Sequence, residues 1–382
     1  MTQPEIPEHV RALADARAAA RERRDWETAD RLRADLEHGG WRIVDKGTRY
    51  RLTPAHPPNV DEGDGVRYGS SASVPSRLTE PATALATVVL RATDRTSDLA
   101  RLLDGLRAHA PEETQVVVVA DDPSPDQEDD LQARQRRDHG PASAAASTAP
   151  EASAASTDGS TASTAPEAST DSTDASLLSL SPEVVWTSAR VGHAAAINIG
   201  IRGAVGRIVV LLDDSVEPVG DFIEPLVRVL ADPRVALCGP WGLLSGDLRH
   251  FGEAAAGKTA TEAASGTAAR SVAAIQGACQ AFRRADYLVR GPLDERLQTP
   301  RWTAIWWSLV LRDEGMGVAP RSALSLPDLP LVHHELGDPD SQPAERSRLA
   351  RRDLYRVIDR FGARRDLAVE LTTAPDGGSA NG

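Results

Sequence analysis

The sequence predicts an α/β fold in which helices cover both faces of a mostly parallel sheet, preceded by a small helical hairpin with a β tail. From about residue 84 onward, short apolar runs suited to buried strands alternate with amphipathic helical segments. This alternation is typical of parallel strands joined by helical crossovers. Ahead of them, apolar and Ala residues recur at helical spacing between residues 7 and 36, which predicts the hairpin.

The first unit spans residues 1–53. His38, Gly39 and Gly40 follow its helical pattern and provide a helix stop. The stretch WRIVDKGTRYRL then indicates a short β-hairpin that turns at Lys46-Gly47.

Three other stretches have the composition of irregular or disordered chain. Residues 54–83 are rich in Pro, Gly, Ser and charge, and we interpret them as a linker. Residues 126–181 are low in complexity, with the unit STAPEAS at 147–153 repeated at 163–169, and we expect a disordered insertion. We expect residues 366–382 to form a flexible tail.

The sheet domain, predicted for residues 84–365, shows its clearest strand and helix patterns on either side of the insertion. Strands are predicted from short runs of buried-type residues, and helices from apolar residues on one face. The predicted strands are 85–90, 115–119, 184–187 and 207–212, and the predicted helices are 98–109, 192–203 and 305–311.

Composition narrows the classes of function. A formal net charge of −13 argues against a general nucleic-acid-binding protein. No apolar run reaches 18 residues and the N-terminus lacks the apolar core of a signal peptide, so we expect no transmembrane helix and a cytoplasmic location. The two cysteines, Cys238 and Cys279, fit buried small side chains better than a disulfide framework or a metal site.

Acidic residues follow two of the predicted strands. Asp121 and Asp122 end one strand, and Asp213 and Asp214 end another. Ligands of open α/β sheets bind beyond the carboxyl ends of the strands, where both clusters fall. Carboxylates there suit a nucleotide sugar, because they accept hydrogen bonds from base or ribose and hold a divalent cation against a diphosphate. The alternative is turn capping, a common use of Asp in such loops.

Four segments, in this order, resemble signatures of family 2 glycosyltransferases. DDPSPD at 121–126 is similar to their DDGSxD motif, and residues 192–206 are similar to their Gly…Asn-x-Gly-Ile…Ala…Gly signature. DDS at 213–215 stands where their DxD motif belongs, and GPLDERL at 291–297 is similar to GxLDExF.

The resemblance implies a glycosyltransferase A-type, Rossmann-like domain that takes a nucleotide-sugar donor and transfers its hexose, with inversion, to an acceptor hydroxyl. It implies a divalent cation, Mn²⁺ or Mg²⁺. The residues it assigns are Asp121, Asp122 and Asp213 for the nucleotide, and Asp213, Asp214 and His334 for the metal.

Two departures from the family pattern bear on catalysis. Ser215 replaces the second Asp of the DxD motif, and Thr303 and Ala304 stand where the family places the acidic pair that supplies the base. Asp294 and Glu295 are the remaining candidates for a catalytic carboxylate. Two hypotheses follow: an active glycosyltransferase, or a catalytically degenerate protein that keeps the fold for binding or scaffolding.

The first unit carries a separate resemblance. Its pattern of Arg, Asp, Trp and Leu between residues 17 and 36, followed by IVDKGTRY at 43–50, is similar to the C-terminal end of bacterial cysteinyl-tRNA synthetases. The HIGH-type and KMSKS-type catalytic motifs of that family are absent from the chain. The resemblance implies an accessory segment, which acts either as a packing module with a solvated Arg-rich face or as an RNA contact.

Overall fold

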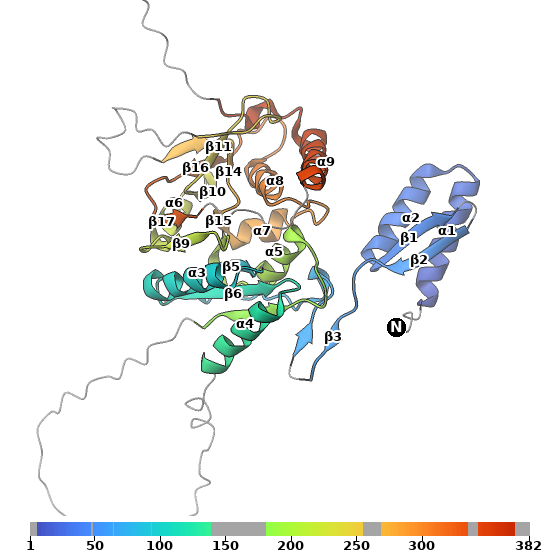
Figure 1. The fold of residues 1–382 in the computed structure, drawn as a ribbon. Coiled ribbons are helices and arrows are strands. Elements are labelled where there is room, and N and C mark those ends of the chain that lie inside the picture. The colour runs from blue at the N-terminus through green and yellow to red at the C-terminus, as the bar shows by residue number, and fades with distance from the viewer. Residues whose placement is uncertain are drawn as a thin grey trace, which may run out of the picture.

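The computed structural model describes residues 6–46, 49–63, 65–92, 94–138, 181–254, 269–334 and 343–370. Figure 1 labels most of its helices and strands. The N-terminal unit consists of two helices and an antiparallel hairpin: α1 (Glu8–Glu22), α2 (Trp26–His38), β1 (Trp41–Lys46) and β2 (Arg49–Pro54). Val10, Ala14, Leu36 and Ile43 form its small core. The predicted helical hairpin with a β tail is confirmed, although Gly47 of the predicted turn lies outside the described residues.

The main sheet has eight strands in the order β13-β16-β10-β15-β8-β5-β6-β7. β15 runs antiparallel to both neighbours and β13 antiparallel to β16, whereas every other pairing is parallel, so the predicted mostly parallel sheet is confirmed. Its strands are β5 (Ala84–Ala92), β6 (Thr114–Ala120), β7 (Glu183–Trp186), β8 (Gly206–Leu212), β10 (Val235–Gly239), β13 (Arg270–Val272), β15 (Cys279–Arg283) and β16 (Ser322–Ser325).

Helices cover both faces of this sheet because the side chains of each strand alternate between them. Val88 and Leu90 pack with α3 and α6, whereas Val89 packs with α5, α7 and α8. These helices are α3 (Thr96–His109), α4 (Pro125–Asp138), α5 (His193–Arg202), α6 (Ile223–Leu230), α7 (Arg284–Arg290), α8 (Pro300–Arg312) and α9 (Pro343–Phe361).

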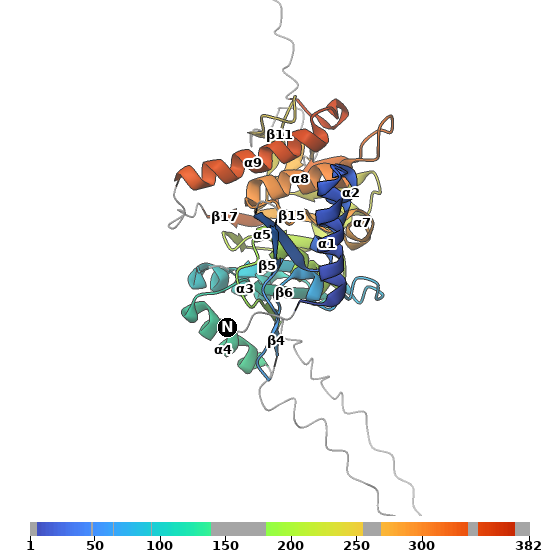
Figure 2. The ribbon, with the colours of Figure 1, turned by 90° about the vertical axis from the view of Figure 1, so that its right-hand side faces the viewer.

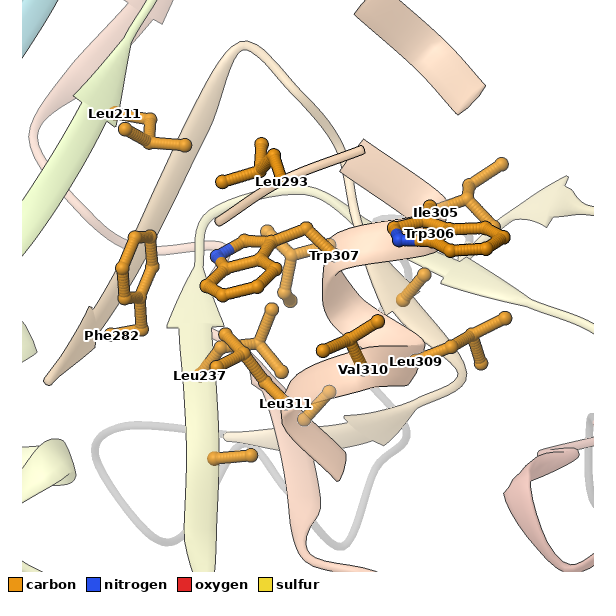
Figure 3. Packing of buried hydrophobic residues seen from close by; sticks show 14 of the residues in the cluster. Leu211, Leu237, Phe282, Leu293, Ile305, Trp306, Trp307, Leu309, Val310 and Leu311 are labelled. Carbon is orange, nitrogen blue, oxygen red and sulfur yellow. The ribbon is translucent and has the colours of Figure 1, made fainter. Parts of the chain in front are cut away.

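The core on the α8 face is built around Trp307, which is fully buried. Figure 3 shows its ring next to Phe282 of the sheet, with Leu293 of the loop before α8 above it. The rings of Trp307 and Phe282 meet edge to face with their centroids 5.4 Å apart. α9 lies along α8, as Figure 2 shows, and Phe361 packs edge to face on Trp306. The predicted buried helix over residues 305–311 is therefore confirmed as part of α8.

Smaller elements surround the main sheet. They are β3 (Val60–Asp61) with β4 (Val66–Arg67), β9 (Val216–Pro218) with β17 (Leu331–His333), the three-stranded sheet of β11 (Gly242–Leu244), β12 (Gly252–Glu253) and β14 (Ala274–Ile275), and the short 3₁₀ helices Ser71–Ser73 and Arg365–Leu367.

The segment predicted to be a linker packs against the sheet domain. Tyr68 forms a parallel bridge with Thr187 beside β7, and Leu78 is buried in the core on the α5 face. Arg284 donates a hydrogen bond to the carbonyl of Glu80 at 2.8 Å. Isolated apolar residues hold this segment against the sheet domain. The linker prediction rested on its overall Pro, Gly and Ser composition, which does not indicate such single contacts.

The predicted insertion and tail also begin later than the composition indicated. Residues 126–138 belong to α4, whose Leu131 is buried in the core on the α3 face, and residues 139–180 lie outside the described residues. Leu367 is buried, and Val369 exchanges backbone hydrogen bonds with Ser245. Residues 371–382 lie outside the described residues.

Candidate functional site

A cavity of about 350 Å³ opens at the carboxyl ends of β5 and β8. The two strands are parallel neighbours, so the residues that follow them meet at one edge of the sheet. The polar and charged side chains that line the cavity are Arg91, Asp94, Arg95, Arg190, His193, Asp213 and Asp214. Gly277 and Pro300, the first residue of α8, also line it.

Two residues of the predicted Asn-x-Gly signature hold α5 against this edge. A Cβ atom on Gly200 would lie 2.3 Å from Val89 Cγ1, so only glycine lets the helix approach β5 this closely. Asn198 is buried, and its amide hydrogen-bonds to the carbonyl of Leu293 at 3.0 Å and to Glu295 at 2.9 Å. Its oxygen accepts from Tyr287 and from Leu293 N–H. This signature therefore joins α5 to the loop before α8.

Asp121 is paired with Arg91 of the cavity lining, and its carboxylate is completely buried. Arg91 donates to Asp121 Oδ2 from Nε and Nη2, at 3.0 and 2.9 Å. The backbone N–H of Val191 donates to Oδ1 at 2.7 Å. Both carboxylate oxygens of Asp121, which was predicted to contact the nucleotide, thus accept hydrogen bonds from the protein itself. Arg91 lines the cavity, whereas Asp121 is not among the lining residues.

Asp122 adopts a left-handed backbone conformation, with φ of 54°. Its N–H donates to Thr187 Oγ1 at 3.1 Å, and its side chain is 59% exposed. The carboxylate lies 3.8 Å from Arg190. Asp122 is therefore at the rim, next to Arg190, and is not among the residues that line the cavity.

Asp213 and Asp214 both line the cavity, as their place after β8 predicted. Oδ1 of Asp213 accepts hydrogen bonds from the N–H of Ser215, at 3.0 Å, and from the Ser215 hydroxyl. Asp214 is buried. Ser215 thus caps the turn by donating to the first carboxylate, whereas an Asp at this position would add a second carboxylate.

His193, the first residue of α5, is a site residue that the sequence reasoning missed. Burial and the nearby Arg91 guanidinium lower the pKa of its imidazole to about 4, against a smaller opposing effect of Asp213. The ring is therefore neutral at pH 7. The sequence did offer one indication that His193 belongs to the site: it directly follows Gly192, the first residue of the signature at 192–206.

A second, smaller cavity of about 220 Å³ adjoins the first. The two share Asp213, Gly277 and Pro300. The second is also lined by Ser215, Gln276, Arg301 and His333, among others. The ring of His333 packs on Trp241 with the centroids 4.9 Å apart.

His334 lies beside the turn after β8, because its N–H donates to the carbonyl of Ser215 at 2.9 Å. Its Nε2 makes a 2.7 Å hydrogen bond with Glu217, and neither cavity includes it. Adjacent residues at a strand end point in opposite directions. His333, one residue earlier, is the histidine that shares a cavity with Asp213.

The two candidate catalytic carboxylates lie apart from both cavities. Asp294 accepts hydrogen bonds from Arg296 at 2.8 and 2.7 Å and lines a different hollow, which includes Arg356 of α9. Glu295 accepts from Asn198 and from Ser71. Both carboxylates organise the loop before α8.

Ala304 lies next to the wall shared by the two cavities. A Cβ atom on Gly277 would be 3.3 Å from the Cβ of Ala304. Thr303, its neighbour, is buried and donates to the carbonyl of Thr299 at 2.9 Å. The first turn of α8 thus adjoins the site without contributing a carboxylate to it.

The donor atoms at this edge do not fit a preformed divalent-cation site. In the part of the chain that the structure describes, no group of three or more His, Cys, Asp or Glu side chains could hold a metal ion. Asp213 Oδ1 is occupied by Ser215, and His334 is bonded to Glu217. Mg²⁺ requires near-ideal octahedral oxygen coordination, which this arrangement does not provide.

Family models match two parts of the chain. Residues 158–288 match the model of glycosyl transferase family 2, and residues 3–51 match that of the cysteinyl-tRNA ligase anticodon binding domain. The sheet domain is therefore similar to family 2 glycosyltransferases. The matched part of this domain includes Asn198, Asp213 and Ser215, whereas Asp121 and Ala304 lie outside it.

The curated relatives match the N-terminal unit. Cysteine–tRNA ligase 1 of Burkholderia lata is 50% identical over 48 residues, which are 13% of this chain and 10% of that protein. The cysteine–tRNA ligase of Opitutus terrae is 43% identical over 51 residues, which are 13% of this chain and 11% of that protein. The chain thus spans about a tenth of the length of these relatives.

Solved structures similar to this chain are glycosyltransferases of low sequence identity. GalNAc-T7 with UDP, GalNAc and Mn²⁺ has a TM-score of 0.49 and 15% identity, covering 72% of this chain and 48% of that chain. Staphylococcus aureus TarS 1–349 has a TM-score of 0.42 and 12% identity, covering 74% and 68%. The mannosyltransferase PcManGT from Pyrobaculum calidifontis, with GDP-Man and Mn²⁺, has a TM-score of 0.42 and 16% identity, covering 77% and 75%. Separately, none of the helices in the described ranges is long and apolar enough to cross a membrane.

Proposed function

We propose that the glycosyltransferase domain binds a nucleotide sugar in the larger cavity and transfers the sugar, slowly and with inversion, to an acceptor hydroxyl in the smaller one. The observation that carries this proposal is the pair of adjoining cavities that share Asp213, Gly277 and Pro300. Both open at the carboxyl edge of the sheet, where α/β domains bind ligands.

The larger cavity is suited to the donor. At about 350 Å³ it falls within the usual size of small-molecule sites. Guanidinium groups on its lining can pair with phosphate oxygens, and carboxylates can accept hydrogen bonds from hydroxyl groups. Neutral His193 can donate or accept without adding charge.

The smaller cavity is suited to the acceptor, because a hydroxyl there could approach the sugar from the side opposite the leaving diphosphate. Attack by a hydroxyl requires a base, and a positioned base contributes ~10²–10⁴-fold to the rate. Ala304 cannot accept a proton. Two side chains that line this cavity can accept a proton: Asp213, one oxygen of which already accepts from Ser215, and His333. We assign the role to His333.

A second candidate is a catalytically degenerate protein that binds a nucleotide sugar without transferring it. The observation that favours it is the position of Ala304 against Gly277, where the first turn of α8 contributes no carboxylate to the shared wall. The two candidates agree on binding and differ only in turnover. We interpret residues 1–53 as a packing module in either case, and two of their arginines, Arg17 and Arg21, are paired with Asp45 within the unit.

One experiment tests both candidates. Nucleotide sugars with different bases and hexoses are screened by thermal shift, and nucleoside diphosphate release is then measured for those that bind. We expect at least one to bind and to be turned over slowly. Asp213→Ala should weaken binding, whereas Asp122→Ala at the rim should have little effect. A chain that binds none of them contradicts the proposal, and binding without any release favours the degenerate protein.

A further inference from the structure

We propose that the donor diphosphate is bound by arginine side chains, without a divalent cation. This inference rests on the proposed function, because it concerns the same cavity. It departs from the metal dependence that the family resemblance implies, and it is carried by the distribution of donors and acceptors around the cavity.

One oxygen of the Asp213 carboxylate is engaged within the turn after β8. Asp213 Oδ1 accepts two hydrogen bonds from Ser215, and Asp214 is buried at 4% exposure. A cation that approached this turn would compete with Ser215 for the same oxygen. His334 makes its hydrogen bond to Glu217, outside the cavity. The remaining ligands would have to come largely from water and from the nucleotide.

The lining of the cavity also includes positively charged side chains. Arg91, Arg95 and Arg190 all line it. A guanidinium group is always charged and presents a planar fork of donors that matches phosphate oxygens. Guanidinium groups on this lining can donate hydrogen bonds to a departing diphosphate, a task that a metal ion performs in other sites.

Arg91 is held in place before any ligand binds. Nε and Nη2 donate to Asp121, whose carboxylate has no exposed surface. A buried carboxylate that fixes a guanidinium lowers the entropy lost when a ligand binds to it. This pairing also gives Asp121 a role that does not require contact with the nucleotide.

Unlike that of Arg91, the side chain of Arg190 is not fixed by a close hydrogen-bonding partner among the described residues. Its side chain is 59% exposed and lies 3.7 Å from Asp94 and 3.8 Å from Asp122, which is beyond hydrogen-bonding distance. Exposed pairs of this kind contribute little to stability. Turning Arg190 toward a diphosphate therefore costs little, and the bound anion offers stronger, charge-assisted hydrogen bonds.

The carboxylates that line the cavity oppose an anion, so the position of the diphosphate matters. Asp94 already accepts a hydrogen bond from Ser124 N–H at 3.1 Å, and Asp213 accepts from Ser215. We infer that the diphosphate lies toward Arg91 and Arg190, and that Asp213 faces the sugar hydroxyl groups instead.

The test measures the affinity of the full chain for UDP and GDP by calorimetry, in EDTA and in Mn²⁺. We expect the dissociation constant of the tighter nucleotide to be nearly the same in both. Arg190→Ala should weaken it by about 10- to 100-fold in EDTA, the range for losing a charged hydrogen-bonding partner. Arg190→Lys, which keeps the charge and loses the fork, should fall between. Raising the salt concentration should also weaken binding.

Arg228→Ala on α6 is the matched control, because Arg228 is 76% exposed and does not line the cavity. It should leave both affinities unchanged. Binding that appears only with Mn²⁺, or an Arg190→Ala variant that binds like the parent, overturns this inference while leaving the proposed function intact. Absence of nucleotide binding under both conditions overturns the two together.

Discussion

Arg91 donates two hydrogen bonds to Asp121, and the carboxylate that accepts them is completely buried. The same carboxylate accepts from Val191 N–H, so one side chain ties the end of β5 to the loop that leads into α5. Asp121, in the acidic cluster after β6, therefore has a structural role at the cavity. Of this ion pair, the basic residue, Arg91, is the one that lines the cavity.

Asp121→Ala should destabilise the fold by about 3 kcal/mol, because it leaves the Arg91 guanidinium and a buried N–H without their partner. Urea unfolding measures the change. Asp122→Ala is the matched control, since that side chain is 59% exposed and should change the free energy of unfolding by less than about 0.5 kcal/mol. Equal stabilities of the two variants would mean that the Arg91–Asp121 pair does not hold the site.

Periodicity made the elements of the sheet domain predictable, because alternating and helical patterns follow directly from which side chains are buried. It also placed both acidic clusters at the ends of parallel strands. The direction of each side chain was not predictable. Whether Asp121 or Asp122 turns inward depends on the left-handed backbone at Asp122. Whether His333 or His334 faces the cavity depends on how β17 pairs with β9.

Contacts made by isolated residues were also beyond the sequence reasoning. Tyr68 and Leu78 anchor a segment whose composition is that of a linker, since single apolar residues produce no period. Arg91 lies within an apolar strand, where the buried Asp121 beside it accepts its hydrogen bond. His193 follows a recognised glycine, but its role becomes visible only with its neighbours in space.

The depressed pKa of His193 predicts that stability falls on acidification. Burial and Arg91 lower this pKa from 6.5 to about 4. Between these values the unfolded chain binds a proton that the folded chain does not, so the contribution is fully present above pH 6.5 and is lost as the pH falls toward 4. The loss should reach no more than about 3 kcal/mol. His193→Gln should flatten the stability profile in this window, and an unchanged profile would contradict the assignment.

Asp353 of α9 should support the site from a distance. It is fully buried, and Oδ2 accepts from Gln298 N–H, Thr299 N–H and the Thr299 hydroxyl at 2.8–3.0 Å, immediately before Pro300 on the cavity wall. Asp353→Ala should cost about 2 kcal/mol of stability and weaken nucleotide binding. Asp359→Ala, an exposed change on the same helix, is the control. Full nucleotide affinity in a folded Asp353→Ala variant would show that α9 does not position the wall.

Residues 139–180 should be dispensable for folding, because their Ser, Ala, Thr and Pro composition cannot bury a core. Residue 138 ends α4 and residue 181 precedes β7, so a Gly/Ser linker between them preserves both elements. The melting temperature should stay nearly unchanged in this deletion. Removing α4 as well is the contrasting variant and should destabilise the domain, since Leu131 is buried. A marked fall in melting temperature for the shorter deletion would mean that the segment packs on the domain.

Transfer should be limited because α8 places no carboxylate beside the wall between the two cavities. Ala304 lies against Gly277 on that wall, so Ala304→Asp would introduce a carboxylate where an acceptor hydroxyl could reach it. A positioned base contributes ~10²–10⁴-fold, so nucleoside diphosphate release in the presence of acceptor should rise toward that range. Ala304→Asn introduces a side chain of nearly the same size as Asp that cannot act as a base, so it separates the effect of proton transfer from that of repacking.

Combining Ala304→Asp with Ser215→Asp adds a carboxylate to the turn after β8 and should make turnover respond to Mn²⁺. Because Ala304 is only 4% exposed, unfolding of each variant must be measured beside its activity. Rapid turnover by the parent chain would mean that another residue, such as His333, already supplies the base.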